Sequence, residues 1–338
     1  MITLPFAVSL SHSSDLVQTI GAEFHLDSQE LAAAHELVEA GLPPLVEPEI
    51  LSFLFGISNS LLAEMAHESW RFYRRYKIAK SSGGMRRIEA PRRFLKLVQA
   101  WILQHILTKA PIAEQAHGFV RGHSIFSNAR VHTESRNLMV VDIKDFFPSV
   151  GAREVRRVFS RLGYPRRTAN RLTSLCTLEG HLPQGAPTSP TLANAVFAPQ
   201  DRALAQLALS WGCKYSRYAD DLAFSGDRCF TARDIRAVRD VLQAGGFAVN
   251  RRKTRIIGAG GRRLVAGLVL NGATQPLPPR TQRRRWRAMF QQARVAPQSF
   301  SERSQSLSGI AAFVKEYDEV LASEYASIAR LAREAGET

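Results

Sequence analysis

The sequence predicts an α+β fold of two or three subdomains, and three observations support that prediction. At 338 residues the chain is too long for one small core, so several packed regions are expected. The centre alternates short apolar stretches with helical periodicity, whereas both ends show helical patterning alone. Two adjacent carboxylates lie between two such apolar stretches, at the tip of a predicted hairpin.

Helical signals open the chain. Asp27 and Glu30 have the spacing of a capping box, and the apolar-periodic run that follows them stops at Gly41. Further helices are predicted over residues 60–76 and 94–109. Between these two helices, a glycine-rich stretch flanked by basic residues indicates a hairpin.

The central part supplies the predicted sheet. The expected elements are a buried strand at 138–143, helices at 152–162 and 167–176, and strands at 214–218 and 222–225 around Ala219-Asp220-Asp221. A proline-rich segment follows Asn271, and the tail beyond it is helical and rich in arginine at its start. The segment after Asn271 is therefore a candidate subdomain boundary.

The charge distribution favours a polyanionic partner. The chain has 45 Lys and Arg against 30 Asp and Glu, a net charge of +15. Residues 1–70 contain ten acidic residues and no Lys or Arg, so the remainder carries +25. This division indicates a basic surface for phosphates and an acidic one for another partner, or a merely solvated acidic helical layer.

Three cysteines, Cys176, Cys213 and Cys229, have neither metal-binding spacing nor the density of a disulfide framework. Three free thiols and no zinc are expected. The amino terminus lacks a basic segment before its apolar stretch, which Pro5 interrupts, and no run approaches membrane-spanning length. The expected location is the cytoplasm, without a membrane partner.

Asp142 lies at the end of one predicted strand, and Asp220 and Asp221 lie at the tip of a neighbouring hairpin. Three converging carboxylates suit two divalent cations about 3.5–4 Å apart, which is the arrangement that nucleotidyl transfer uses. Oxygen ligands favour Mg²⁺. By itself the tetrapeptide is a weak signal, because an Asp-Asp pair at a turn is usually only solvated.

The blocks around these aspartates resemble, in order, those of the reverse transcriptase family. The matching stretches are YKIAKSSGGMRRIEAP from Tyr76, AHGFVRGHSI from Ala116, DIKDFFPS from Asp142, LPQGAPTSP from Leu182, YADD from Tyr218 and GFAVNRRKT from Gly246. The resemblance implies a right-hand polymerase fold that copies RNA into DNA. It implies an acidic helical extension at 1–70, fingers at 71–137, a palm at 138–271 and a short helical thumb at 272–338.

The resemblance also implies roles for single residues. Catalytic roles fall to Asp142, Asp220, Asp221 and Lys253, and two Mg²⁺ ions to Asp142, Ile143, Asp220 and Asp221. Lys253 would lie near the leaving pyrophosphate, as a proton donor or only as a charge. Contacts with the incoming nucleotide fall to Lys80, Arg86, Phe147, Gln184, Gly185 and Tyr218.

Two of these nucleotide contacts have plain alternatives. Phe147 is the expected steric gate that excludes a 2′-hydroxyl, whereas Phe146 is expected in the core. The charges of Lys80 and Arg86 would close over the triphosphate, or they belong to an ordinary basic hairpin that touches the template backbone.

Two further stretches resemble retron reverse transcriptases. Asn128-Ala129-Arg130-Val131-His132 is similar to their NAxxH signature, and Val265-Ala266-Gly267 stands where they carry Val-Thr-Gly, with Ala266 replacing threonine. RNA contacts are therefore expected at Asn128, His132, Val265, Ala266, Gly267, Arg283, Arg284, Arg285, Trp286 and Arg287. The alternatives are a satisfied polar pair within one helix for Asn128 and His132, and a solvated helix face for the arginines.

Membership of the retron group would imply specific partners. These are a structured noncoding RNA that is both template and primer, deoxynucleotides, a branched RNA–DNA product, and a separate effector protein in antiphage defence. The acidic residues 1–70, with Glu36 and Glu39, are the hypothetical effector-facing surface. Other readings are a diversity-generating or abortive-infection reverse transcriptase, or an idle RNA-binding scaffold, which has no need of adjacent carboxylates.

Overall fold

The protein forms two compact units in a computed structural model that describes residues 14–79, 83–271 and 275–337. The first unit comprises Met1–Phe119, Ile143–Leu204 and Val238–Val249, and the second comprises Val120–Asp142, Ala205–Ala237 and Asn250–Thr338. Helices and antiparallel strands occur together, which confirms the predicted α+β class. Each unit combines separate stretches of chain, and the three boundaries between the four segments expected from the sequence stay predictions.

From Ser14, where the described residues begin, the first unit opens with four helices: α2 (Ser14–Glu23), α3 (Ser28–Glu39), α4 (Glu49–Phe55) and α5 (Asn59–His67). The predicted capping box is present, because the Asp27 carboxylate accepts from the Glu30 backbone N–H at 2.8 Å and the Glu30 carboxylate accepts from that of Asp27 at 3.0 Å. The helix predicted over 60–76 is wrong beyond His67, since the chain there turns through η1 (Ser69–Phe72) into a paired strand.

That strand belongs to the predicted basic hairpin. Strand β1 (Tyr73–Ala79) pairs antiparallel with β2 (Met85–Pro91), so that Tyr73 lies opposite Pro91 and Ala79 opposite Met85. Behind the hairpin, Gln99 on α6 (Arg93–His105) donates from Nε2 to the Tyr73 hydroxyl and to the Leu175 carbonyl, both at 2.8 Å. This buried amide therefore ties the hairpin to a helix far along the chain.

The helices predicted over 152–162 and 167–176 are present as α8 (Ala152–Arg161) and α9 (Arg166–Cys176). The first unit also contains η2 (Leu107–Lys109) and α10 (Ser189–Ser210), and α10 continues into the second unit. The apolar stripe of α8 is buried at Val155, Val158 and Phe159, as the spacing of three and four residues requires.

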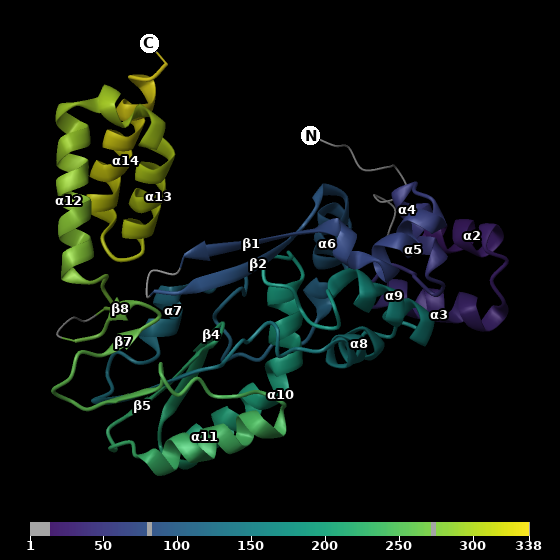
Figure 1. Cartoon of the computed structure of the whole chain (residues 1–338), viewed down its shortest axis with the longest axis horizontal. Coiled ribbons are helices and arrows are strands. Elements are labelled where there is room, and N and C mark those ends of the chain that lie inside the picture. The colour runs from purple at the N-terminus through teal and green to yellow at the C-terminus, as the bar shows by residue number, and fades with distance from the viewer. Residues whose placement is uncertain (1–13, 80–82, 272–274, 338) are drawn as a thin grey trace. The chain divides into compact units, whose positions relative to one another are not determined.

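The second unit is built on a four-stranded antiparallel sheet (Figure 1). Its strands, in the order β4-β5-β3-β6, are β4 (Lys214–Tyr218), β5 (Asp221–Gly226), β3 (Asn137–Asp142) and β6 (Arg255–Ile257). Every residue of β3 is buried, as expected for a central strand without polar alternation. Helix α11 (Ala232–Ala244) follows β5 and continues into the first unit.

A short helix and a small hairpin cover part of this sheet. Phe126 and Ala129 on α7 (Ile125–Arg130) pack with Val140, and with Val265 and Leu268 on the hairpin. That hairpin pairs β7 (Leu264–Val265) with β8 (Leu268–Val269). The two residues between its strands have positive φ angles, +48° at Ala266 and +83° at Gly267, which is the requirement of a two-residue hairpin turn.

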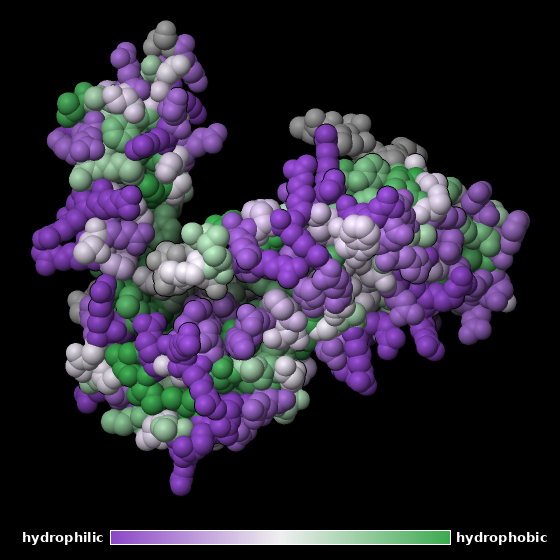
Figure 2. All heavy atoms as spheres, in the orientation of Figure 1, coloured by the Kyte–Doolittle hydropathy of each residue, from purple (hydrophilic) through white to green (hydrophobic). Residues whose placement is uncertain are grey.

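The carboxyl-terminal part of the second unit is a helical bundle (Figure 1), as the sequence predicts. It contains α12 (Arg280–Val295), η3 (Pro297–Arg303), α13 (Ser304–Lys315) and α14 (Glu319–Glu334). Its core includes Phe290, Leu307, Val314 and Ile328. Figure 2 shows hydrophilic side chains gathered over the half of α12 from which that helix starts, and this half carries the arginine run.

Within the described residues, no single helix is both long and apolar enough to cross a membrane. The pair α4 and α5 passes that test only when taken together, and the two helices are bent by 116° at their junction. The three cysteines are free thiols as predicted, with Cys176 buried and Cys229 exposed.

Candidate active site

The sheet of the second unit brings the predicted carboxylates together. Strands β3 and β5 pair so that Asp142 lies directly opposite Asp221, and Asp221 also lies opposite Tyr218 on β4. Ala219 and Asp220 form the turn of the β4–β5 hairpin, with Ala219 at a φ of +56°. Asp142 is only 2% exposed, whereas Asp220 and Asp221 are half-buried. Residues that are 78 positions apart in sequence thus share one edge of the sheet.

A buried arginine supports this hairpin turn from within the unit. The guanidinium Nη1 of Arg217 donates to the Ala219 carbonyl oxygen at 3.0 Å, and the Arg217 side chain is fully buried. A buried guanidinium is costly unless it is well bonded, so its contact with the turn specifies the local backbone. The only signal of this role in the sequence is a charged residue inside the predicted strand 214–218, whose other charged residue, Lys214, is exposed.

Lys253 lies against the carboxylates. Its Nζ donates to Asp142 Oδ2 at 2.6 Å, and the Asn250 backbone N–H donates to the Asp142 carbonyl oxygen at 2.8 Å. This hydrogen bond to Asp142 is the largest cause that raises the pKa of Lys253. Lys253 therefore lies beside the predicted catalytic carboxylates, and its place near the leaving pyrophosphate stays a prediction.

The carboxylates of Asp142, Asp220 and Asp221 repel one another. Burial raises the pKa of Asp221 to about 6, with Asp220 and Asp142 adding to the shift while Lys253 and Arg255 oppose it. A raised carboxyl pKa means that the ionised form is disfavoured and gains from a proton or a cation. The electrostatics thus favour cation binding at this edge of the sheet.

The donor set fits a hard cation such as Mg²⁺, because the available ligands are carboxylate oxygens. The Lys253 ammonium group lies where such a cation would neutralise Asp142. Among residues 14–79, 83–271 and 275–337, no three acidic, histidine or cysteine side chains are gathered around one point as for a bound metal. The Ile143 side chain is buried and apolar, so only its backbone carbonyl is able to serve as a ligand.

In the first unit, the predicted nucleotide-positioning loop contacts the basic hairpin. The Glu89 backbone N–H on β2 donates to the Gln184 carbonyl oxygen at 2.9 Å. Gly185 has a φ of +135°, and a Cβ there would lie 3.1 Å from the Glu89 carbonyl oxygen. Glycine is therefore required at 185 for the approach of the hairpin backbone, a reason that the sequence did not reveal.

Phe147 faces a cavity of about 280 Å³ in the first unit. The cavity is lined by Lys96, Phe119, Phe147, Gly185, Ala186, Pro187, Ser189 and Pro190. The Phe119 and Phe147 rings lie 6.1 Å apart. Phe146 instead is 4% exposed and packs against Phe197 and Phe247, so its predicted place in the core is confirmed.

Of the two basic residues predicted to cover the triphosphate, only Arg86 is among the described residues. Arg86 is exposed on β2, opposite Ile78 on β1. Lys80 lies outside the described residues.

The Asn128 and His132 side chains are 1% and 0% exposed, so they do not form a surface for direct RNA contact. The Ser216 hydroxyl donates to Asn128 Oδ1 at 2.6 Å and lies 2.7 Å from His132 Nε2. The Ser225 hydroxyl lies 2.7 Å from His132 Nδ1. Asn128 on α7 and His132 just beyond the end of that helix are thus bonded to β4 and β5. Their burial corrects the predicted RNA contact of the two side chains to a structural role.

The remaining residues predicted to contact RNA are unequally exposed. On the β7–β8 hairpin, Val265 is buried in the core, Ala266 is half-buried and Gly267 is exposed, so the Val265 side chain is corrected to a packing role. On α12, Arg284, Arg285 and Arg287 are exposed, whereas Arg283 and Trp286 are half-buried. The basic run is thus divided between two environments.

A cavity of about 140 Å³ adjoins the carboxylates in the second unit. It is lined by Asn128, Val140, Asp221, Ala223, Arg255, Leu264, Val265, Ala266 and Gly267. The β7–β8 hairpin and the sheet edge that carries Asp221 therefore border one hollow.

Comparison with known proteins gives consistent similarities. A family model described as reverse transcriptase (RNA-dependent DNA polymerase) matches residues 78–283. The chain is 39% identical over 303 residues to the retron Mx65 reverse transcriptase of Myxococcus xanthus, which covers 83% of this chain and 70% of that protein. It is 35% identical over 251 residues to the retron Ec86 reverse transcriptase of Escherichia coli, covering 73% and 78%.

Proposed function

Because this chain belongs to the reverse transcriptases of bacterial retrons, and is thus an RNA-directed DNA polymerase, we propose a specific product and mechanism for it. It copies part of its own structured noncoding RNA into single-stranded DNA that stays joined to the RNA as a branched molecule. The chemistry is two-metal nucleotidyl transfer at Asp142, Asp220 and Asp221. The observation that supports this best is the cross-strand pairing of Asp142 with Asp221 beside Asp220.

Reverse transcriptases use divalent metal ions, and the carboxylate oxygens together with the Ile143 carbonyl are the proposed ligands here. Two Mg²⁺ ions would lower the pKa of the attacking hydroxyl and neutralise charge that develops on the transferred phosphate. The hydroxyl oxygen forms the new bond to the α-phosphorus, and pyrophosphate leaves. Lys253, whose Nζ donates to Asp142, would face the leaving pyrophosphate when Asp142 binds a metal ion, as a charge or as a proton donor.

Selection of the incoming nucleotide is assigned to the first unit and to Tyr218. The Phe147 ring faces an open cavity, which supports its role as the gate that excludes a ribose 2′-hydroxyl. Gly185 lines the same cavity, and Gln184 precedes it in the chain. Both are proposed contacts of the incoming nucleotide, and Arg86 and Lys80 are the proposed phosphate contacts. In this proposal residues 71–137 act as fingers, 138–271 as palm and 272–338 as thumb, with 1–70 as an added helical layer.

An RNA template is implied by membership of the family, and we assign binding of this RNA to the carboxyl-terminal helical bundle. Exposed arginines at the start of α12 supply phosphate contacts that tolerate any sequence. We further assign the chain to an antiphage system in which a separate effector protein contacts the acidic helices of residues 1–70. The enzyme would act in the cytoplasm.

The decisive variant replaces Asp220 and Asp221 with asparagine. Purified with its nucleic acid, the natural protein should yield RNA and DNA joined through a linkage that a debranching enzyme opens, and sequencing both strands identifies the template. The variant should lose DNA synthesis below detection while still holding RNA, because metal ligands are removed and the basic surfaces remain. Recovery of RNA alone from an active natural preparation would contradict the branched product.

A further inference from the structure

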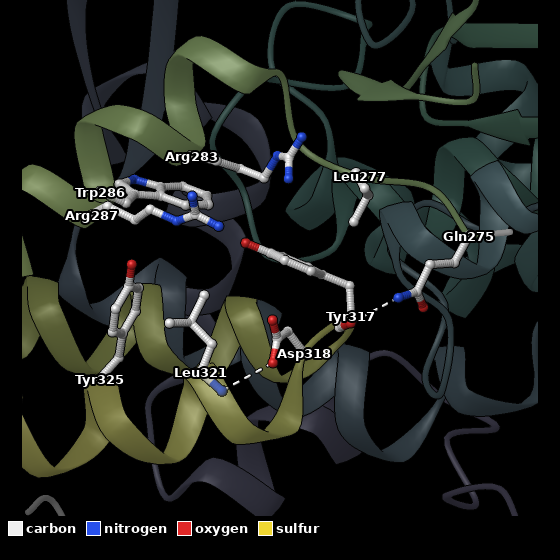
Figure 3. A pocket seen from close by; sticks show the side chains of 9 residues that line it. All are labelled: Gln275, Leu277, Arg283, Trp286, Arg287, Tyr317, Asp318, Leu321 and Tyr325. Atoms are coloured by element: carbon white, nitrogen blue, oxygen red, sulfur yellow. Dashed lines mark hydrogen bonds between the residues drawn. The ribbon is translucent and has the colours of Figure 1, made fainter. Parts of the chain in front are cut away.

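A cavity of about 230 Å³ opens in the carboxyl-terminal bundle, between the start of α12 and the link from α13 to α14. Its wall combines cations, aromatic rings and one carboxylate: Arg283, Trp286, Arg287, Tyr317, Asp318 and Tyr325 (Figure 3). All of these residues belong to the second unit. The cavity is separate from the carboxylates of the proposed active site, none of which lines it.

The spacing on α12 explains why only part of the arginine run reaches this cavity. Arg283, Trp286 and Arg287 are three and four residues apart, which places them on one face of the helix. Arg284 and Arg285 do not line the cavity. Two guanidinium groups and an indole ring thus converge on one hollow, while their neighbours in sequence cover the outer surface.

Two tyrosines complete the wall. Figure 3 shows the Tyr317 hydroxyl pointing toward Trp286 and the guanidinium groups, and the Tyr325 hydroxyl pointing toward Arg287. Burial raises the pKa of both phenols, so each hydroxyl keeps its proton and remains a donor. The Tyr325 ring stacks on Phe290 at 3.7 Å between centroids, and the residue is 4% exposed.

The Tyr325 hydroxyl has no hydrogen-bond partner among the described residues. Buried hydroxyl groups are nearly always paired, because an unpaired one has lost its bonds to water. Arg287, an exposed and therefore adjustable side chain, lies beside this hydroxyl in Figure 3. A small movement of Arg287 would let a ligand in the cavity supply the missing partner.

The mixture of groups selects a class of ligand. A simple anion would suit the two arginines but would be repelled by Asp318, whose Oδ1 accepts from the Leu321 backbone N–H at 3.0 Å while its second oxygen remains for a ligand. A nucleotide offers N–H donors of its base to such a carboxylate, the flat face of that base to an indole, and a phosphate to guanidinium groups. The volume is below the roughly 300 Å³ at which pockets for drug-sized ligands begin, which suits one ring rather than a stacked run.

We propose that this cavity binds one unpaired nucleotide of the RNA, with its base beside Trp286 and its phosphate on Arg283 and Arg287. The inference rests on the proposed function, since it takes the RNA to be held by the bundle. In this proposal the cavity contacts an individual base, whereas the exposed Arg284 and Arg285 contact phosphates only. The RNA must therefore present a flipped or looped-out base at this place.

Replacing Tyr325 with phenylalanine tests the proposal with two effects of opposite sign. Removal of an unpaired buried hydroxyl should raise the thermal midpoint of the ligand-free protein, yet weaken binding of the co-purified RNA by about threefold to tenfold. The matched control is Tyr164→Phe, because the Tyr164 hydroxyl is also buried without a partner in the described chain, and Tyr164 is 3% exposed in the first unit. The control should raise stability and leave RNA affinity unchanged. Equal RNA affinity for both variants would overturn the proposal.

A second pair of variants compares arginines on the same helix. Arg283→Gln and Arg285→Gln each remove one charge, so each should reduce the salt dependence of RNA binding by about one unit of slope. Only Arg283 lines the cavity, and its variant should weaken binding about tenfold more than the Arg285 variant. Equal losses would mean that the cavity contributes nothing beyond general charge.

These outcomes separate failure of the inference from failure of the proposed function. If the natural protein purifies without RNA and binds none, the proposed function itself fails. If RNA is bound but both cavity variants match their controls, only the cavity assignment is overturned. Release of a co-purified protein by the cavity variants, with RNA still held, would show a polypeptide occupant and would also overturn it.

Discussion

The imidazole of His132 joins both strands of the hairpin that carries Asp220 and Asp221, through Ser216 on β4 and Ser225 on β5. The Ser216 hydroxyl also donates to Asn128 Oδ1 at 2.6 Å, and the Ser225 hydroxyl donates to the Ser135 hydroxyl at 2.9 Å. The ring is therefore part of a buried hydrogen-bond network that includes both strands of this hairpin. Its position makes it a support for the carboxylates.

Replacement of His132 with alanine should lower the free energy of unfolding by about 2–3 kcal/mol, because two buried serine hydroxyls lose a partner and a cavity is left. Urea denaturation of the ligand-free protein measures this change, with His35→Ala on the exposed face of α3 as the control. If His132 instead contacted RNA, its variant would lose RNA affinity without losing stability. That result would refute the structural role.

At the level of single elements, the β7–β8 hairpin contains a local conflict between sequence and backbone. Ala266 adopts a φ of +48°, a left-handed conformation that costs an L-residue about 1 kcal/mol and that asparagine accepts more readily. Gly267, which follows it at +83°, carries no such cost. The turn is therefore strained at one residue only.

Ala266→Asn should raise the free energy of unfolding by about 0.5–1 kcal/mol, and Ala266→Thr should lower it by a similar amount because a β-branched side chain fits this conformation worst. Thermal unfolding of the two variants beside the natural protein measures both signs. An asparagine variant that is no more stable than the natural protein would show that the turn adopts another conformation in solution. A gain in RNA affinity with threonine would point to a hydroxyl contact that alanine lacks.

Some secondary-structure elements are predicted well by the sequence and others are not. The strands around Asp142 and Asp221 are short apolar runs with turn residues between them, so periodicity alone located them. The helix predicted over 60–76 is wrong from Tyr73 onward, because the pairing of this segment with Met85–Pro91 outweighs its local helical pattern. Spacing predicted Asn128 and His132 on one helix, whereas α7 ends at Arg130 and His132 lies in the turn that follows. Spacing also could not show that their partners would be serines more than 80 residues away.

For the whole molecule, the negative charge is concentrated in residues 1–70 and the excess positive charge lies in the rest of the chain. The acidic helices α2 to α5 belong to the first unit, where the Thr168 hydroxyl on α9 donates to the Val46 carbonyl oxygen at 3.2 Å, and Arg167 lies 3.0 Å from the Glu47 carboxylate. Ala34 and Leu37 of α3 are buried, whereas Glu36 and Glu39 are exposed. The layer is thus anchored on one face and acidic on the other.

Reversing the charge of Glu36 and Glu39 to lysine should reduce co-purification of the proposed effector, expressed from the gene beside the enzyme, by about tenfold or more, since like charges would then oppose each other. DNA synthesis should be unchanged. The same double reversal at Glu302 and Glu334, exposed residues of the carboxyl-terminal bundle, is the control for net charge. Undiminished co-purification would remove this surface from consideration.

The bond between the Glu89 amide and the Gln184 carbonyl has a consequence for anyone who redesigns this enzyme. Since a Cβ at position 185 would lie 3.1 Å from the Glu89 carbonyl oxygen, the hairpin and the loop are fitted to each other and should be exchanged together. Exchanging the hairpin alone between relatives would remove an anchor of the loop. Recombination breakpoints are therefore better placed outside the two segments than between them, so that both come from the same parent.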